Sequence, residues 1–421
     1  MRGVFRGWSV VAGVFGMLLV TAGLGFYGLP VYLRALTVEQ GFSVGAVSGA
    51  TAVFFLVSGV AGLPVAGWME RHDPRPLVAA GAVGCAVALL LLGRATAVWQ
   101  VYVAYAVFGT GFAACALVPG TTLVTRWFSR RRSVALSVAS SGLSVGGAVI
   151  TPVVATVVED EGLAATTPWL ALVLVATVVP LTAWLLRSSP EELGLQPDGA
   201  AAPVQGAAPA YRGDGAAAAL RSRYFAAVTA AHLLAMLAQV GGIAHLYNLV
   251  AERRDAGDAA SALSLLALSS LLGRLLGGVV AARTSMRGLA VGLMVGQAAA
   301  LVALAVLDGR TALLVTSVAF GLTVGNLLML HPLLLAERFG VLDYGRIYSR
   351  SQLVATLGVA VGPLFIGALH DVVEGYGIAF AVAGAASLLA AGVLCTSGPT
   401  TVRPPAVRGS ARGPVPVEEV A

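Results

Sequence analysis

Long apolar runs, each followed by a short polar segment, recur along almost the whole chain. A helix that crosses a membrane needs about 20 consecutive apolar residues, and these runs reach that length. They do not alternate polar and apolar residues as the strands of a membrane barrel do. The pattern predicts an all-α integral membrane protein with twelve transmembrane helices, near residues 8–33, 43–68, 77–93, 98–124, 132–157, 166–187, 224–250, 260–282, 288–307, 312–336, 346–370 and 375–397.

One polar segment is much longer than the others and divides the predicted spans into two sets of six. It is rich in proline, glycine and alanine, which is typical of a linker. The last residues are rich in proline and lack an apolar run, which is typical of a disordered tail. We therefore expect an N-terminal six-helix bundle in residues 1–190, a cytoplasmic linker in 191–222, a C-terminal six-helix bundle in 223–397 and a disordered cytoplasmic tail in 398–421.

The two halves share a short motif. Arg71 and Arg75 follow the second predicted span, and Arg283 and Arg287 follow the eighth. The residue numbers of corresponding members differ by 212 in both cases. Internal repeats of this kind are typical of secondary transporters, so we expect two pseudo-symmetric bundles that rock around a central site.

Composition and charge support a membrane protein and suggest its orientation. Only 11% of the residues are charged, against about 25% in a typical soluble domain. All 26 basic residues are arginines; twenty fall on one side of the predicted spans, five on the other, and Arg274 lies within a span. Cytoplasmic loops are enriched in basic residues, so we expect a multi-pass protein of the cytoplasmic (inner) membrane with both termini in the cytoplasm. All six tryptophans lie at predicted span ends, where tryptophan anchors a helix at the membrane interface.

Arg274 is the one permanently charged residue deep within a predicted span. It lies about eight residues from the end of the eighth span, hence about 12 Å into the apolar layer. A charge at that depth costs at least about 2.5 kcal/mol, so it needs a cavity or a partner. The predicted spans contain no acidic residue, so the natural partner is an external anion, and the guanidinium fork fits a carboxylate. The alternative is that Arg274 snorkels to the interface or bonds the carbonyls of a helix end.

Uncharged polar residues in the spans supply further candidates. His245 follows Gly241 and Gly242 in the seventh predicted span, where a local helix break would open it to a central cavity. Its imidazole suits a proton carrier, although a packed interior histidine is the alternative. Tyr27 and Asn326 lie beside glycines and are the other candidates for lining a cavity.

The remaining reactive side chains form no motif. His72 lies in a loop, His232 lies in the seventh span, and His331 and His370 are interpreted as structural. The three cysteines are far apart and have no metal-ligand spacing. Nucleophile motifs and lysine-containing phosphate loops are absent from the sequence. We therefore predict no enzyme activity, no metal and no cofactor, and we interpret the basic cluster at 126–132 as a lipid anchor rather than a nucleic-acid site.

The loop motif resembles one found in the major facilitator superfamily. Glu70, Arg71 and Arg75 match the acidic-basic motif of its loop after the second helix. In the second copy, which contains Arg283 and Arg287, alanine stands in the place of the acid. The resemblance implies the major facilitator fold and a conformational role for both loops.

More specifically, the chain is similar to the monocarboxylate transporters and oxalate/formate antiporters of that superfamily, in their bacterial type. Their fifth helix begins with an aromatic-Phe pair and basic residues, followed by spaced small residues. The matching positions here are Trp127 to Arg132, then Ala135, Ala139, Gly142 and Gly146, with Ser137 where the family usually has glycine. Three other segments resemble the same branch, namely 189–199, 337–340 and 362–363.

This resemblance carries over to particular residues. The family places a substrate-carboxylate arginine on the eighth helix, and Arg274 matches that position. Animal members have an acid one turn earlier for proton coupling, where this chain has Ser270. Oxalate exchangers add a lysine on the eleventh helix, which this lysine-free chain lacks; one carboxylate per transport cycle is therefore favoured. The resemblance also implies that Cys115 and Leu143 lie near the site.

Together these patterns predict a secondary active transporter that moves a small monocarboxylate such as lactate or pyruvate by alternating access, with a proton as the expected co-substrate. Arg274 would bind the carboxylate, His245 and Asn326 would contact its other polar end, and Tyr27 and Leu143 would shape the cavity. His245 is also the candidate proton carrier. The expected surroundings are the lipid bilayer, with no nucleic acid and a monomeric chain. The alternatives are exchange of organic anions such as formate or oxalate and, more distantly, a membrane sensor that does not transport.

Overall fold

The regular structure of this protein is helical. The computed structural model describes residues 5–128, 132–188, 190, 216–281, 284–339 and 344–398. Within those ranges all regular elements are helices, and they form twelve segments long and apolar enough to cross a membrane. The prediction of an all-α membrane protein with twelve spans is therefore confirmed.

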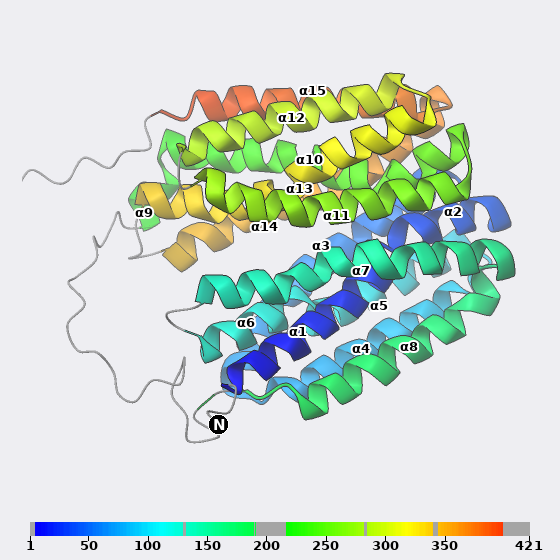
Figure 1. Ribbon diagram of the computed structural model, residues 1–421, viewed down its shortest axis with the longest axis horizontal. Coiled ribbons are helices and arrows are strands. Elements are labelled where there is room, and N and C mark those ends of the chain that lie inside the picture. The colour runs from blue at the N-terminus through cyan, green and yellow to red at the C-terminus, as the bar shows by residue number, and fades with distance from the viewer. Residues whose placement is uncertain are drawn as a thin grey trace, which may run out of the picture.

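The first six spans form the N-terminal bundle (Figure 1). Its elements are α1 (Gly7–Thr21), η1 (Ala22–Phe26), α2 (Leu29–Gln40), α3 (Val44–Arg71), α4 (Pro74–Leu92), α5 (Val98–Cys115), α6 (Leu117–Trp127), α7 (Arg132–Glu161) and α8 (Leu163–Trp184). The first span consists of α1, η1 and α2, and the fourth consists of α5 and α6.

The last six spans form the C-terminal bundle. Its elements are α10 (Arg223–Arg253), α11 (Ala256–Ala281), α12 (Met286–Val306), α13 (Arg310–Phe339), α14 (Tyr344–Val373) and α15 (Tyr376–Cys395). A short helix, α9 (Ala216–Leu220), precedes them within the segment expected to be the linker. Most of that segment and the expected tail lie outside the described residues.

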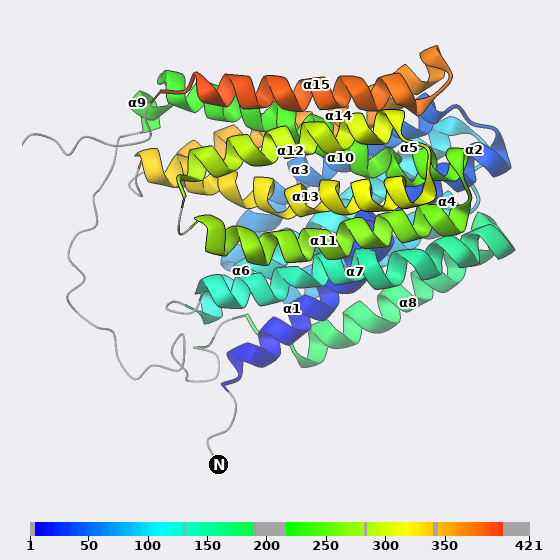
Figure 2. The same cartoon turned by 45° about the horizontal axis from the view of Figure 1, so that its top comes forward.

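The spanning helices lie side by side along the long axis of the molecule, and both described ends of the chain lie at the same side of it (Figures 1 and 2). We call this side the terminal face, and the opposite side, where α2 leads into α3 and α7 into α8, the distal face. The arrangement matches an even number of membrane crossings.

Two spans are interrupted, and local residues explain both interruptions. In the first span, η1 is a π-turn, and the Tyr32 hydroxyl donates to the Leu24 carbonyl within it at 2.8 Å. The hydroxyl supplies the hydrogen bond that this carbonyl would receive from a backbone N–H in a regular helix. In the fourth span the backbone breaks at Ala116, with φ −120° and ψ −123°. Pro119 follows three residues later, and proline offers no N–H to the carbonyl four residues before it.

Close approach of backbones connects helices within each bundle in the same way. A Cβ at Gly146 of α7 would overlap the Leu19 carbonyl oxygen of α1, and a Cβ at Gly358 of α14 would overlap the Leu233 carbonyl oxygen of α10. The two glycines are again 212 residues apart. Small residues bring membrane helices close because lipid supplies no hydrophobic force between them. The repeat expected from the loops therefore recurs in the packing.

The tryptophan expectation holds only in part. Trp99 and Trp184 lie at helix ends and Trp169 lies in the second turn of α8, and all three are largely exposed. Trp127 is fully buried, and its Nε1 donates to the Arg187 carbonyl at 3.0 Å. Its position at a span end was predicted correctly, but its role as an interfacial anchor is wrong, because the ring packs between helices of its own bundle.

Candidate substrate-binding site

Arg274 lies on α11 and extends across the boundary between the two bundles, where α11 and α7 run side by side (Figure 2). The side chain is half-buried. Its Nη1 donates to the Ser140 carbonyl at 3.4 Å, and its Nη2 donates to Ser144 Oγ at 3.5 Å, both on α7. Its Nε is buried and finds no hydrogen-bond partner within the described ranges. The guanidinium therefore retains donors that an anion can use.

No described acidic side chain forms an ion pair with Arg274. Asp258, the buried acid on the same helix, pairs instead with Arg310 at 2.7 Å at the distal end. A half-buried cation without a counter-charge is costly in an apolar surrounding. The arrangement favours binding of an external anion.

Tyr27 lies close to this guanidinium. The residue follows the π-turn η1, is 4% exposed, and interacts electrostatically with Arg274. Its ring packs against Gly147 of α7, where a Cβ would come within 2.7 Å of it. The break in the first span thus brings an aromatic ring to the bundle boundary, and π-turns are frequent at functional sites.

Asn326 of α13 supports the helix that carries Arg274. Its Nδ2 donates to the Gly273 carbonyl at 2.6 Å and to the Leu322 carbonyl at 3.3 Å. A Cβ at the neighbouring Gly325 would come within 3.0 Å of Arg274 Nε. The missing side chain therefore leaves the room that the arginine stem occupies.

Leu143 and Cys115 are the two residues that only the family resemblance implied, and the structure places Leu143 beside the contacts of Arg274. Leu143 is half-buried on α7, between the two serines that Arg274 contacts. Cys115 is fully buried, and its Sγ lies 3.8 Å from Cys85 Sγ of α4. The thiol therefore faces another helix of its own bundle.

His245 occupies a different place from the one expected. Helix α10 continues without a break through Gly241 and Gly242, so the predicted opening there is wrong. The two glycines instead let α10 pack closely against α14 and Phe320. His245 is fully buried and lies nearer the distal face.

Both ring nitrogens of His245 have partners. Nδ1 lies 3.1 Å from the Tyr376 hydroxyl, and Nε2 lies 2.9 Å from the Pro363 carbonyl and 3.2 Å from Ser48 Oγ. A carbonyl only accepts, so Nε2 carries a proton and Nδ1 accepts from Tyr376 when the ring is neutral. Ser48 belongs to α3 of the other bundle, so the ring bridges the two bundles.

The loop motif is described only in part. The side chains of Glu70 and Arg71, and the whole of Arg283, lie outside the described residues. Arg75 contacts Asp73, whose carboxylate caps α4 and accepts from Arg75 Nε at 3.0 Å.

Asp73 was not among the predicted motif residues, although an acid just before a proline at a helix start is a capping signal. Partial burial alone would raise the pKa of its carboxyl. Hydrogen bonds from the Arg75 N–H, the Ser188 hydroxyl and the Arg75 guanidinium outweigh that effect and lower the pKa.

Arg287, the counterpart of Arg75, donates to the carbonyls of Cys395 and Gly398. These groups lie at or just beyond the end of α15, where carbonyls lack helical partners. Arg287 thus joins the start of α12 to the end of α15 at the terminal face, whereas the contact described for Arg75 is local.

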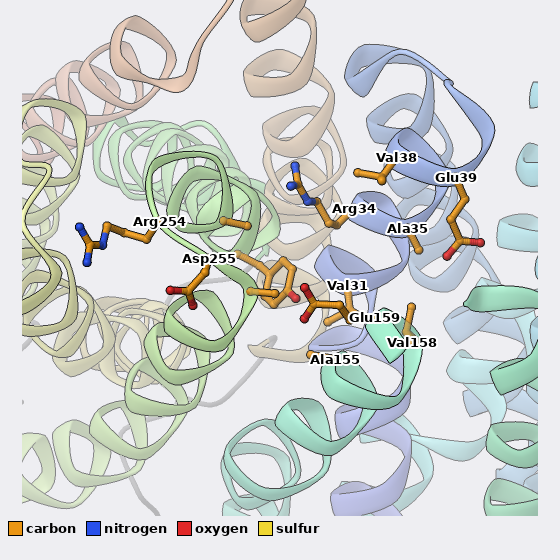
Figure 3. A pocket seen from close by; sticks show the side chains of 13 residues that line it. Val31, Arg34, Ala35, Val38, Glu39, Ala155, Val158, Glu159, Arg254 and Asp255 are labelled. Atoms are coloured by element: carbon orange, nitrogen blue, oxygen red, sulfur yellow. The ribbon is translucent and has the colours of Figure 1, made fainter. Parts of the chain in front are cut away.

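A separate pocket of about 350 Å³ lies at the distal face, between the ends of α2, α7, α10 and α11 (Figure 3). Its charged lining contains two arginines and three acids, namely Arg34, Glu39, Glu159, Arg254 and Asp255. The Glu39 carboxylate accepts from the Leu163 N–H at 3.0 Å. The mixed charge does not favour an anion, so Arg274 remains the better candidate.

The described residues contain no group of three or more His, Cys, Asp or Glu side chains that could hold a metal ion.

Comparison with known proteins agrees with the architecture. The sequence profile of the Major Facilitator Superfamily matches residues 14–330. Monocarboxylate transporter 13 of Bos taurus is 29% identical over 339 residues, which cover 77% of this chain and 74% of that protein. Monocarboxylate transporter 13 of Rattus norvegicus is 27% identical over 333 residues, with the same coverage of both chains.

A solved structure shares the fold. It is a bacterial homologue of the human lysosomal transporter Spinster, in an inward-facing and occupied conformation. It superposes with a TM-score of 0.70 over 94% of this chain and 97% of its own, at 13% sequence identity.

Proposed function

The chain belongs to the major facilitator superfamily, and on this basis we propose that it is a secondary active transporter of a small monocarboxylate such as lactate or pyruvate. The observation that carries the proposal is the half-buried guanidinium of Arg274 between the bundles, with its Nε buried and unpaired within the described ranges. A carboxylate bound there would accept two parallel N–H bonds. The similarity to proteins named Monocarboxylate transporter 13 supports the same substrate class.

The number of charges supports a substrate with one carboxylate. The chain has no lysine, and the two partners described for the Arg274 guanidinium, Ser140 and Ser144, are uncharged. A dianion would bring a second negative charge without a partner into an apolar surrounding. In this proposal Tyr27 and Leu143 shape the cavity, and Asn326 positions α11 and contacts the polar end of the substrate.

We assign proton coupling to His245. Transport of an anion alone would move net charge, and a co-transported proton removes it. The His245 ring contacts Ser48 across the bundle boundary, so separation of the bundles at the distal face would change its hydrogen bonds. Nδ1 takes up a proton when the hydroxyl of Tyr376, which belongs to the same bundle, turns its O–H away from the ring.

We place the terminal face in the cytoplasm of a bacterial cell, because most arginines lie at that end of the spans. A monomer suffices for the proposed mechanism, since both bundles and the site between them belong to one chain. The two bundles would alternate in opening the site to either face.

Uptake into proteoliposomes tests the proposal. Purified protein is offered a panel of labelled monocarboxylates and dicarboxylates, with and without an inward proton gradient. We expect saturable monocarboxylate uptake that the gradient increases, and loss of that uptake in Arg274→Ala.

The matched control is Arg310→Ala, which removes an exposed distal arginine and should preserve uptake. Unchanged uptake in Arg274→Ala would overturn the binding assignment. Uptake that requires a trapped counter-anion and ignores the gradient would replace proton symport by anion exchange.

A further inference from the structure

A second pair of titratable groups lies within the C-terminal bundle, apart from Arg274 and His245. His232 of α10 and His331 of α13 are 3% and 2% exposed. Their rings stack with centroids 3.9 Å apart and planes inclined by 12°. The two residues are 99 positions apart in the sequence, so the fold creates the pair.

Hydrogen bonds hold one ring in place. His331 Nε2 lies 2.7 Å from Ser351 Oγ of α14, and Ser351 Oγ lies 2.7 Å from Thr229 Oγ1 of α10. Thr229 stands one turn before His232 on the same helix. Three helices thus meet at the stacked rings, so a change of charge there acts on all three.

One ring nitrogen of the pair is still able to accept a hydrogen bond or a proton. His331 Nδ1 is buried and has no hydrogen-bond partner in the described part of the chain. A cavity of about 10 Å³ is lined by both histidines, which is about the space that one water molecule needs. A buried imidazole nitrogen without a partner is unfavourable, and uptake of a proton from such a water would satisfy it.

No described acidic side chain lies among the residues around the pair, so none would stabilise a positive charge on each of the two rings. α12 and α15 contribute Ala290, Met294 and Leu394 to the cavity, and α14 contributes the Tyr348 ring, 5.6 Å from His331. The other lining groups of α10 and α13 are aliphatic. Two imidazolium charges at the stacking distance would repel each other strongly in this apolar setting, so the pair accommodates one positive charge.

We propose that His232 and His331 form a proton-binding site that takes up one proton in total, on one ring or the other. A proton from the aqueous phase reaches one ring nitrogen through the water in the cavity and leaves by the same route, and the net charge of the pair alternates between zero and plus one. Leu394 and Leu334 place the cavity near the terminal face. The site would therefore exchange protons with that side.

The position of the pair links it to the anion site. His331 follows Asn326 by five residues, or about 7 Å along α13, and Asn326 Nδ2 bonds the Gly273 carbonyl next to Arg274. If a charge on the pair moves α13, the hydrogen bond of Asn326 would transmit the movement to α11 and so change the position of Arg274. This use of the proton rests on the proposed function, whereas proton binding itself does not.

Nitrogen NMR of the purified protein with labelled histidine tests proton binding directly, without any substrate. We expect the signals of His232 and His331 to respond together as the pH is lowered and to account for one proton in total. In His232→Gln the titration midpoint of His331 should shift by about one unit or more, because coupled groups titrate as a pair. The surface variant His72→Gln should leave both signals unchanged.

Ser351→Ala provides a milder variant that keeps both rings. It should shift both titrations by removing the hydrogen bond to His331 Nε2. Signals that titrate independently, or that do not respond to pH in the wild type, would reduce the pair to a packing contact and overturn the proposal.

A transport measurement then tests the link to carboxylate movement. In proteoliposomes, His331→Gln should reduce gradient-driven accumulation by about ten-fold, and should reduce one-for-one carboxylate exchange less, since exchange needs no net proton movement. Equal losses in both assays would contradict the link. If the wild type transports no carboxylate, the proposed function fails, and the NMR result still decides whether the pair binds a proton.

Discussion

The guanidinium of Arg274 lies between two bundles that must separate and rejoin in an alternating-access cycle. Its two bonds to α7, at 3.4 and 3.5 Å, are long for charged hydrogen bonds, which usually measure about 2.7–2.9 Å. A bound carboxylate can replace them without breaking a strong internal contact. His245 differs, because its closest contacts, at 2.9 to 3.2 Å, already satisfy both nitrogens.

Replacing Arg274 by lysine keeps the charge but removes the two-pronged geometry. We expect the apparent KM for the carboxylate to rise by about ten-fold or more, since a charged hydrogen bond contributes about 1.5–3 kcal/mol. The dependence of initial uptake on substrate concentration in proteoliposomes measures this change. An unaltered KM in Arg274→Lys, with Arg310→Lys as the reference, would show that charge alone binds the anion.

At the scale of the helices, small residues and local interruptions determine how closely neighbouring helices pack and which side chains reach the boundary between the bundles. The spaced small residues at the start of the fifth span have a packing role here, since Ala135 and Ala139 are buried and Gly146 touches the backbone of α1. The break in the first span brings Tyr27 to the same boundary. These features place the backbone of α7 where Arg274 can reach Ser140 and Ser144.

Two glycine-to-alanine variants separate packing from helix propensity. Gly146→Ala puts a methyl group into the Leu19 carbonyl and should lower stability by about 1–3 kcal/mol, as overpacking does. Gly292→Ala of α12 meets no atom within 4 Å and should be neutral or stabilising by up to about 1 kcal/mol. Thermal unfolding in detergent compares them, and equal melting temperatures for the two variants would contradict the close contact of α1 with α7.

On the scale of the whole molecule, α3 packs against α14, α7 against α11, and α2 against α10. Several side-chain contacts between bundles lie toward the distal face. Asp371 Oδ2 accepts from the Gly45 N–H at 2.7 Å, and Asn248 Nδ2 donates to the Pro30 carbonyl at 3.4 Å. The Asp371 carboxylate thus lies at the N-terminus of α3, where the helix dipole favours negative charge.

Asp371→Ala should therefore favour opening at the distal face. Loss of a carboxylate at a helix N-terminus costs about 1 kcal/mol, which corresponds to about a five-fold change in the ratio of open to closed molecules. Spin labels at positions 38 and 306, introduced after Cys395→Ser, report the distance between the bundles at that face. Glu161→Ala removes an exposed acid from the same face and serves as control; an equal shift in both variants would rule out a specific contact.

The sequence alone determined the membrane class, the twelve spans and the isolation of Arg274. Lipid requires every spanning backbone to satisfy its own hydrogen bonds, so the length of an apolar run almost dictates a helix. A charge within such a run is conspicuous for the same reason. Both kinds of information are local to one segment.

Only the tertiary structure decided which side chains meet. Ser48 beside His245, Ser140 beside Arg274, and His232 beside His331 come from different helices. The Cys115 thiol contacts Cys85, and the Trp127 ring is buried within its own bundle. Helix α10 continues through its glycine pair, where a break was expected. The rotation of a helix in lipid depends on small-residue contacts with its neighbours rather than on a polar and an apolar face. The sequence of one helix therefore does not determine its partners, and the candidate site emerges only when the two bundles are placed together.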